Sequence, residues 1–182
     1  MRYPDGHNET VRTRIVEAAS RALRRDGIDA VSIPKLMKLV GLTHGGFYVH
    51  FRDRDELVAE AIAHTQTDSA LASDVPASEA FGRYLSMGHV RHPEVGCVIA
   101  ALGVEGARQH GPVRRAFAEA ATRLLRGVER RLHPKSGDGA LSDEALATAS
   151  RIVGAVVLAR LVQDEALADR LLESAKGRVG RR

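Results

Sequence analysis

The chain has 182 residues, of which 44% are hydrophobic and 4% aromatic; this composition favours helices over sheets and suits one domain, or a small domain beside a medium one. Its net charge of +4 is compatible with a polyanionic partner and equally with ordinary solubility. A single cysteine, Cys97, excludes an internal disulfide framework. Neither a secretory signal nor an apolar run of roughly 20 residues is found, so we expect a soluble, cytoplasmic protein without membrane contact.

A flexible arm and one long helix are predicted at the N-terminus. Residues 1–9 are polar and include proline and glycine, which predicts an arm without fixed structure. From Thr10 onward, apolar residues recur with the 3.6-residue period of a helix. They are Val11, Ile15, Ala18, Ala19, Ala22 and Leu23. Gly27 is placed to end this helix as its C-terminal cap.

A helix–turn–helix is predicted next. Ser32 is a suitable N-cap for a short helix over 32–40, the turn GLT follows, and Thr43 caps a third segment. A three-residue turn containing glycine is typical of this motif, whose second helix presents its N-terminal residues to the DNA major groove. Gly45 and Gly46 could instead form a β-hairpin turn, but no partner strand precedes them. Their missing side chains would let the backbone approach DNA, although spacing alone leaves open a helical corner without a DNA role.

The pattern stays helical beyond this motif. Phe47 and Phe51 are one helical turn apart, and we expect both to face the first helix. Asp53 and Glu56 form a variant of the capping box at the start of a helix over 54–68.

A polar break around Pro76 then leads to a second helical domain. The helices expected there span 78–88, 94–110, 113–132, 142–162 and 165–176. The basic, glycine-containing tail 177–182 is expected to be disordered.

Residues RTRIVEAASRALRRDGIDAVSIPKLMKLVGLTHGGFYVHFRDRDELVAEAI resemble the DNA-binding domain of the tetracycline-repressor (TetR) family. The resemblance rests on I-x-x-A-A, G-x-x-x-V-S-I, G-L-T-x-G-x-F-Y-x-H-F and a final E-L, and it covers about a third of the chain. It implies an all-α homodimeric transcription factor, usually a repressor that a small-molecule effector releases from a near-palindromic double-stranded operator, without a cofactor. The implied divisions are a flexible arm 1–9, a three-helix DNA-binding domain 10–52, a linking helix 53–72, a helical ligand-binding and dimerisation domain 77–176, and a basic tail 177–182.

The resemblance also implies the DNA contacts. Tyr48 and His50 would contact phosphates, as would Arg54, which stands where the family often has lysine. The full set of implied DNA-binding residues is Ser32, Lys35, Thr43, His44, Gly45, Gly46, Tyr48, His50 and Arg54. Positions 44–46 read His-Gly-Gly and leave little side chain for reading bases, so specificity would come from His44 with backbone or apolar contacts, or from DNA shape. Residues 1–65 hold ten Lys/Arg and nine Asp/Glu, so binding depends on where the cations lie.

The stretch GCVIAALGVEGARQHGPVRRAF resembles a subset of the same family in which Gly-Cys opens a helix. Cys97 is then either a small buried residue or, because a helix N-terminus favours the thiolate, an electrophile or oxidant sensor, an effect that Glu94 would oppose. His89, His92 and Cys97 do not match a known zinc spacing, so we expect solvated loop histidines and no metal site. Candidates that either line an effector pocket or form core are Phe81, Tyr84, Leu85, Cys97, Val98, Leu102 and Phe117.

The segment LATASRIVGAVVLARLV, residues 146–162, alternates small and branched apolar residues that allow close helix packing. The resemblance implies that the last two long helices form a four-helix dimer interface, although the first of them can also pack inside the subunit. The interface candidates are Ile152, Val153, Val156, Val157, Leu167 and Leu171.

No nucleophile elbow, glycine-rich phosphate loop, metal motif or meaningful carboxylate pair is found, so an enzyme is not expected. The alternatives that stay open are a helical protein-interaction module without DNA binding, a constitutive regulator without a ligand, and an activator.

Overall fold

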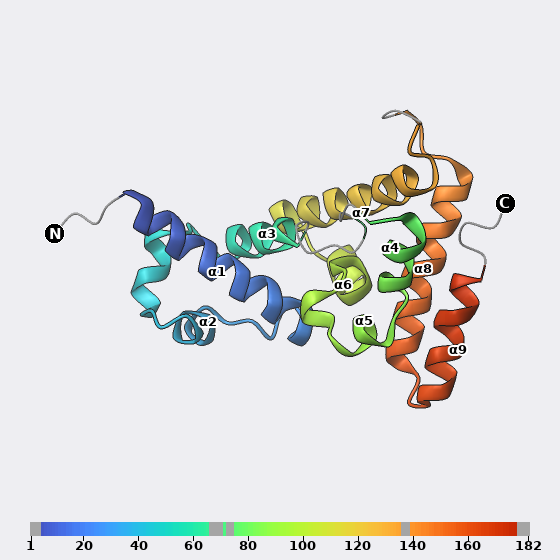
Figure 1. Cartoon of the computed structure of the whole chain (residues 1–182). Coiled ribbons are helices and arrows are strands. Elements are labelled where there is room, and N and C mark those ends of the chain that lie inside the picture. Colours follow the sequence, from blue (N-terminus) through green and yellow to red (C-terminus); the bar gives the residue numbers. More distant parts are fainter. Residues whose placement is uncertain (1–4, 66–70, 72–74, 136–138, 178–182) are drawn as a thin grey trace.

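The computed structural model describes residues 5–65, 71, 75–135 and 139–177, and every regular element within these ranges is a helix (Figure 1). The predicted all-α class is confirmed. The elements are α1 (Asp5–Asp26), α2 (Ile33–Leu39), the 3₁₀ helix η1 (His44–Val49), α3 (Arg54–His64), α4 (Ala77–Tyr84), α5 (Met87–Arg91), the 3₁₀ helix η2 (Pro93–Val95), α6 (Val98–Ala107), α7 (Gly111–Leu132), α8 (Asp143–Leu161) and α9 (Glu165–Lys176). None of the helices in these ranges is both long and apolar enough to cross a bilayer.

The first helix is longer than predicted. α1 begins at Asp5, so the expectation of a flexible arm over all of residues 1–9 is wrong for its second half; residues 1–4 lie outside the described ranges. The predicted C-terminal cap is confirmed, since Gly27 directly follows the helix with a φ of +91°.

Two groups of helices are joined through α3, α6 and α7. α1, α2 and α3 lie at the left of Figure 1, and α4, α8 and α9 lie at the right. α3 packs against both α1 and α7, and α6 also contacts α1. One buried core extends from the left group into α6 and α7, where Val98, Leu102 and Phe117 join it. A second core lies among α4, α8 and α9 and includes Phe81 and Ile152.

Two of the predicted helices are interrupted. The expected helix over 78–88 is divided into α4 and α5, because Ser86 acts as a new N-cap and accepts a hydrogen bond from the His89 amide at 3.2 Å. The expected helix over 94–110 is divided into η2 and α6, with an extended backbone at Gly96 between them. These short breaks bring the start of α6 close to α5.

α8 turns its most apolar face into its own subunit. Ile152 and Val156 are both 0% exposed in the second core, so their assignment to a dimer interface is wrong. A helical period shows that an apolar face exists, but it does not show whether that face meets the same subunit or another one. The apolar side chains on the outward side of α8 and α9 that are exposed or half-buried are Leu146, Val153, Val157, Leu158, Leu161, Leu167 and Leu171.

Candidate nucleic-acid interface and effector cavity

The segment η1 is fixed by a local cap and by two aromatic rings beneath it. The Thr43 hydroxyl accepts a hydrogen bond from the Gly46 amide at 3.3 Å, as expected for an N-cap. Phe47 and Phe51 are 0% and 2% exposed, and their rings stack with centroids 5.4 Å apart. Both rings belong to the core that includes α1, so their predicted orientation is confirmed.

The two adjacent glycines of η1 are not required by the protein's own packing. A Cβ atom added at Gly45 would meet nothing within 4 Å, and one added at Gly46 would meet only Thr43 Oγ1 at 3.7 Å and Met37 Cε at 3.8 Å. Neither glycine has a positive φ, whereas Gly41 in the preceding turn has a φ of +75°. Each glycine costs about 1 kcal/mol of helix stability relative to alanine, and the packing around the pair does not offset that cost.

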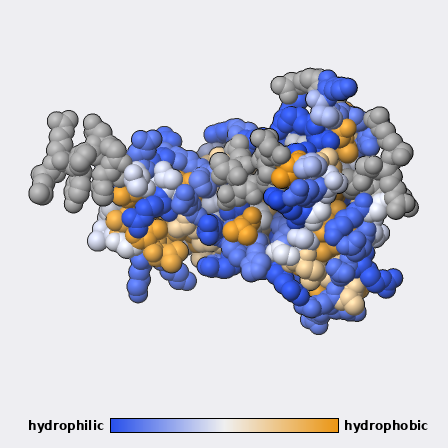
Figure 2. All heavy atoms as spheres, viewed as in Figure 1, coloured by the Kyte–Doolittle hydropathy of each residue, from blue (hydrophilic) through white to orange (hydrophobic). Residues whose placement is uncertain are grey.

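Large apolar side chains are exposed on η1 and at the end of α2. Leu39, Tyr48 and Val49 are 68%, 60% and 70% exposed, respectively. The Tyr48 ring packs edge-on against His44 and Phe47, with centroid distances of 5.7 and 5.2 Å. Figure 2 shows an apolar area at this left end of the molecule. Since such side chains are normally buried, their grouping around η1 indicates a contact surface.

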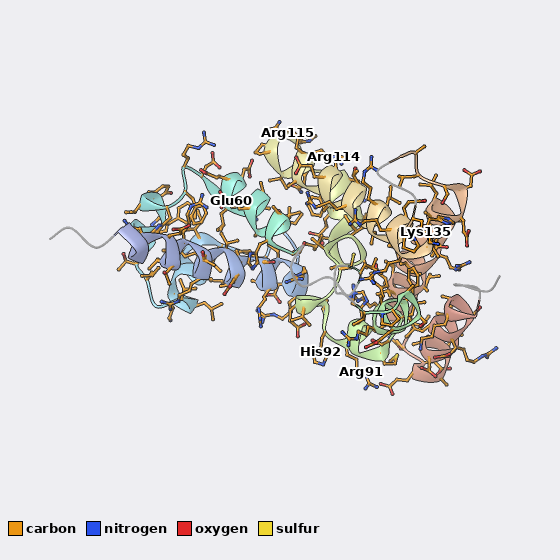
Figure 3. All side chains as sticks on the ribbon, turned by 45° about the horizontal axis from the view of Figure 1, so that its top comes forward. Glu60, Arg91, His92, Arg114, Arg115 and Lys135 are labelled. Carbon is orange, nitrogen blue, oxygen red and sulfur yellow. The ribbon has the colours of Figure 1, made fainter. Side chains whose placement is uncertain are left out.

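Arg12 of α1 links η1 to α3. Its guanidinium pairs with Glu60 and lies 3.6 Å from Glu56, both on α3, while its Nε donates to the His50 carbonyl at 3.2 Å. It also lies 4.5 Å from the centroid of the Phe51 ring. The hydrogen bond to Glu60 is the main reason that the pKa of Arg12 is raised. Figure 3 shows Glu60 on α3, beside α1. The sequence offered no signal for this residue, since its partners are 38 to 48 positions away.

Three other predicted DNA contacts differ in how far the protein itself engages their side chains. Arg54 donates to the Val31 carbonyl at 3.2 Å and to the Ile28 carbonyl, so it braces the connection between α1 and α2. Ser32 occupies the predicted N-cap position of α2, although its side chain makes no capping hydrogen bond. Lys35 is exposed on α2. All three stay predictions as phosphate contacts.

Two side chains that follow η1, those of His50 and Arg52, affect the charge at the surface beside it. Burial, followed by the positive charge of Arg12, lowers the pKa of His50 and so disfavours its charged form. The side chain of Arg52 is 86% exposed and holds Glu56 at 3.1 Å. Arg52 is not among the predicted DNA contacts, although its place one residue after the buried Phe51 indicates an outward direction.

Comparison with known proteins identifies this arrangement. Residues 15–61, which span most of α1 and of α3 with η1 between them, match the family described as "Bacterial regulatory proteins, tetR family". The HTH-type transcriptional regulator TtgR of Pseudomonas putida is 32% identical over 69 residues, which are 36% of this chain and 33% of that protein. Residues 15–61, about a quarter of the chain, are therefore similar to the TetR family. The match to TtgR spans about a third of the length of this curated relative.

Solved structures of TetR-family proteins share the fold of nearly the whole chain. A TetR transcriptional regulator from Chloroflexus aurantiacus J-10-FL superposes with a TM-score of 0.74 and 16% identity, over 97% of this chain and 98% of that one. The reduced form of NemR from E. coli superposes with a TM-score of 0.72 and 16% identity, over 94% and 95% of the two chains. At this level of identity, the likeness extends the TetR-like fold to the second group of helices.

A cavity of about 180 Å³ is lined mostly by residues from the second half of the chain. It is bordered by the end of α3, the start of α6 and the middle of α7, and two of the seven pocket candidates, Cys97 and Val98, line it. The others are not at this cavity. Phe81, Tyr84 and Leu85 lie in the core of α4, α8 and α9, and Leu102 and Phe117 lie in the other core. Helical spacing could not distinguish residues that line the cavity from residues of the core, because both recur with the same helical period.

Cys97 is the N-cap residue of α6 and is half-buried. Its amide donates to His89 Nε2 at 2.9 Å, and His89 Nδ1 lies 2.7 Å from the Tyr84 carbonyl, so the ring carries its proton on Nδ1. Burial is the main cause that lowers the pKa of His89, and the nearby Arg160 and Arg24 act in the same direction. Burial and the Cys97 thiol raise the pKa of Tyr84.

The prediction of solvated loop histidines is therefore confirmed for His92 and wrong for His89. His92 is exposed and lies 3.1 Å from the Glu94 carboxylate, whereas His89 is enclosed by hydrogen bonds. Gly96 makes this enclosure possible, because a Cβ there would lie 2.4 Å from the His89 ring. Within the described ranges, no three His, Cys, Asp or Glu side chains are grouped so that they could hold a metal ion.

Two hydrogen bonds connect α6 to the end of α1. Arg24, which is 3% exposed, donates to the Gly96 carbonyl at 2.8 Å just before α6. At the other end of α6, the Glu105 carboxylate accepts a hydrogen bond from the Ile28 amide at 2.8 Å. A Cβ added at Gly27 would lie 3.3 Å from the same carboxylate. The helix that borders the cavity is thereby fixed to the helix that supports η1.

Proposed function

We propose that this chain is a homodimeric, DNA-binding transcriptional regulator of the cytoplasm, which represses its target until a small-molecule signal releases it. The observation that supports DNA binding most directly is the open space at Gly45, together with the outward Tyr48 beside it. A surface without side chains at the start of a recognition segment lets the backbone reach the floor of a major groove. The DNA-binding domain, linking helix and regulatory domain would follow the divisions predicted from the sequence.

The cations around η1 would hold the segment on the phosphates. Lys35 and Lys38 are exposed on α2, and Arg52 follows η1. Thr43 and His44 would lie at the groove end of the segment. Because residues 1–65 are nearly neutral overall, these few local cations would determine affinity, and we expect binding to fall steeply as salt increases.

The outward side of α8 and α9 would form the dimer contact. Leu161 is 72% exposed on α8 and Leu167 is 41% exposed on α9. A Cβ at Gly154, also on α8, would meet nothing within 4 Å, so another helix has room to approach. Two copies paired here would present two η1 segments to successive major grooves, about 34–36 Å apart, on a near-palindromic operator.

The dimer contact has a matched pair of variants. Leu161→Glu would place a charge within the contact and should give a monomer with weakened operator binding. Val104→Glu changes a side chain that is 70% exposed on α6 and should leave the dimer intact. Sedimentation of both variants measures the association. A wild-type monomer, or a dimer that Leu161→Glu does not weaken, would disprove this interface.

Selection of bound sequences from a random DNA pool tests the proposed function. We expect a near-palindromic consensus, and Tyr48→Ala should weaken binding to it in a mobility-shift assay while the far-UV circular dichroism stays unchanged. No enrichment, together with a protein partner whose binding is insensitive to salt, would instead support a helical interaction module. Enrichment of a motif without any response to small molecules would support a constitutive regulator.

The chemical nature of the signal is also open to test. Cys97 lines the cavity at the start of α6, so an electrophile or oxidant that enters the cavity could modify its thiol. Cys97→Ser should then retain operator binding and lose release by a thiol-reactive compound such as N-ethylmaleimide. Release of the mutant from DNA by the same compound would exclude the thiol as the sensor.

A further inference from the structure

The cavity at the start of α6 has cationic side chains and apolar walls. Arg123 and Arg130 of α7 line it, whereas no carboxylate among the described residues does. Val98, Ile99 and Ala120 provide apolar surface. A cavity with this lining attracts negative charge, and its apolar walls favour a hydrocarbon body over a fully hydrated ion.

Arg123 has hydrogen-bond donors that the described part of the chain leaves unused. Its Nε and Nη2 are shielded from solvent and have no hydrogen-bond acceptor there. Its Nη1 lies 3.4 Å from the Glu119 carboxylate, and Glu119 is itself 67% exposed. The side chain as a whole is 35% exposed. A guanidinium edge without an acceptor is unfavourable, and a turn of this side chain toward the cavity would let a carboxylate ligand bind both donors at once.

The first turn of α6 adds to the positive character of the same cavity. Gly96, Cys97, Val98 and Ile99 all line it, and the Cys97 side chain makes no capping hydrogen bond to the first amides of α6. The positive end of the helix dipole thus meets the cavity wall without a side-chain acceptor from its N-cap residue. This field acts together with the guanidinium of Arg123 on α7.

We propose that this cavity binds a small organic anion, with the carboxylate on Arg123 and an apolar body of about one aromatic ring against Val98, Ile99 and Ala120. The volume of about 180 Å³ fits this size, since an apolar cavity of about 150 Å³ accepts benzene. Arg130, which is exposed on the same side of α7, supplies a second positive charge.

The site is placed to influence the rest of the molecule. Gly96 lines the cavity, and its carbonyl accepts the hydrogen bond from Arg24 of α1. A ligand beside Gly96 would therefore act next to the contact that joins α6 to the helix supporting η1. This regulatory part rests on the proposed function, whereas anion binding itself does not.

Three compounds of nearly the same shape separate charge from size: benzoate, benzamide and benzamidine. Isothermal titration calorimetry on the full chain should show that benzoate binds about tenfold or more tightly than benzamide, with benzamidine weakest. Arg123→Met keeps much of the aliphatic packing and should remove the preference for benzoate. Arg130→Met should reduce it to a smaller extent. The control is Arg115→Met, which changes an exposed arginine at the N-terminal end of the same helix (Figure 3) and should leave all three affinities unchanged.

Several results would overturn the inference. They are no binding of benzoate, equal affinity for the three compounds, a preference that survives in both Arg123→Met and Arg130→Met, or a loss of equal size in Arg115→Met. Circular dichroism of each variant checks its folding, and Arg130→Met remains informative if Arg123→Met is unfolded. DNA binding is measured separately by fluorescence anisotropy, so a chain that binds benzoate but no DNA would refute the proposed function and leave the anion site standing.

Discussion

Replacing Gly45 by alanine should change stability and DNA binding in opposite directions. The added Cβ meets no atom within 4 Å, and the residue has no positive φ, so the folded backbone accepts alanine without strain. A glycine-to-alanine change at such a position stabilises a protein by about 0.4–1 kcal/mol, chiefly because the unfolded chain loses conformational freedom. For a chain of this length, about 1 kcal/mol raises the melting temperature by about 2–4 °C. We therefore expect an increase of about 1–4 °C.

The same methyl group should weaken DNA binding if the backbone of η1 lies against the groove floor. Loss of one close backbone contact is expected to cost about 1.4 kcal/mol or more, which is about tenfold in the dissociation constant. Gly82→Ala on α4 is the matched control, because its Cβ also meets nothing within 4 Å and it lies outside the proposed interface. Differential scanning calorimetry gives the melting temperatures, and fluorescence anisotropy with the selected operator gives the affinities.

The outcome shows whether the glycine at position 45 is needed for DNA binding or is only a local loss of helix stability. Gly82→Ala should be stabilised without any change in affinity, whereas Gly45→Ala should be stabilised and bind more weakly. If Gly45→Ala binds the operator as tightly as the wild type, the backbone of η1 does not approach the duplex at this residue. If Gly45→Ala is destabilised instead, the open space around the residue is not as the structure shows it.

Three other changes test the contacts that organise the fold. Because the pKa of His89 is lowered in the folded state, the unfolded chain binds more protons, and the free energy of unfolding should fall as the pH drops below about 6.5. For one proton, this change is at most about 1.4 kcal/mol per pH unit. His89→Gln should make the pH dependence weaker in urea unfolding measured from pH 5 to 7. Glu105→Ala removes the acceptor of the Ile28 amide and should lower the free energy of unfolding by about 1–2 kcal/mol, whereas an unchanged urea midpoint would show that this hydrogen bond is dispensable. Gly106→Ala would place a Cβ 2.5 Å from the Phe117 ring and should cost about 1–3 kcal/mol by the same measurement, and a stabilised variant would contradict the close packing.

The features that could be predicted from the sequence are those that neighbouring residues determine. Gly27 and Gly41 end helices with a positive φ because no side chain opposes that conformation there. Asp53 and Ser142 cap helices through their own side chains, accepting from amides three residues later. The last helix has the predicted bounds of 165–176. Periodicity and capping act within one or two turns, so they can be read without a tertiary structure.

The features that could not be predicted depend on residues far apart in the chain. The role of Arg12 requires that η1 and α3 be placed first, and Arg54 is held by carbonyls 23 and 26 positions before it. The inward direction of Ile152 is set by the packing of α8 on α9 and other helices. The cavity likewise arises where three helices fail to fill the space between them, and no local pattern reports such a gap.

A signal in this cavity can empty an operator only if it binds the released state more tightly than the DNA-bound one. Tight binding alone does not achieve this, so the ligand must favour one arrangement of the structure that surrounds it. Arg24 and Glu105 join the two ends of α6 to the end of α1, and Arg12 joins α1 to η1 and α3. A displacement of α6 would therefore strain these two partly buried hydrogen bonds. α1 and α3 are thus the elements through which a change at the cavity would reach the glycines of η1.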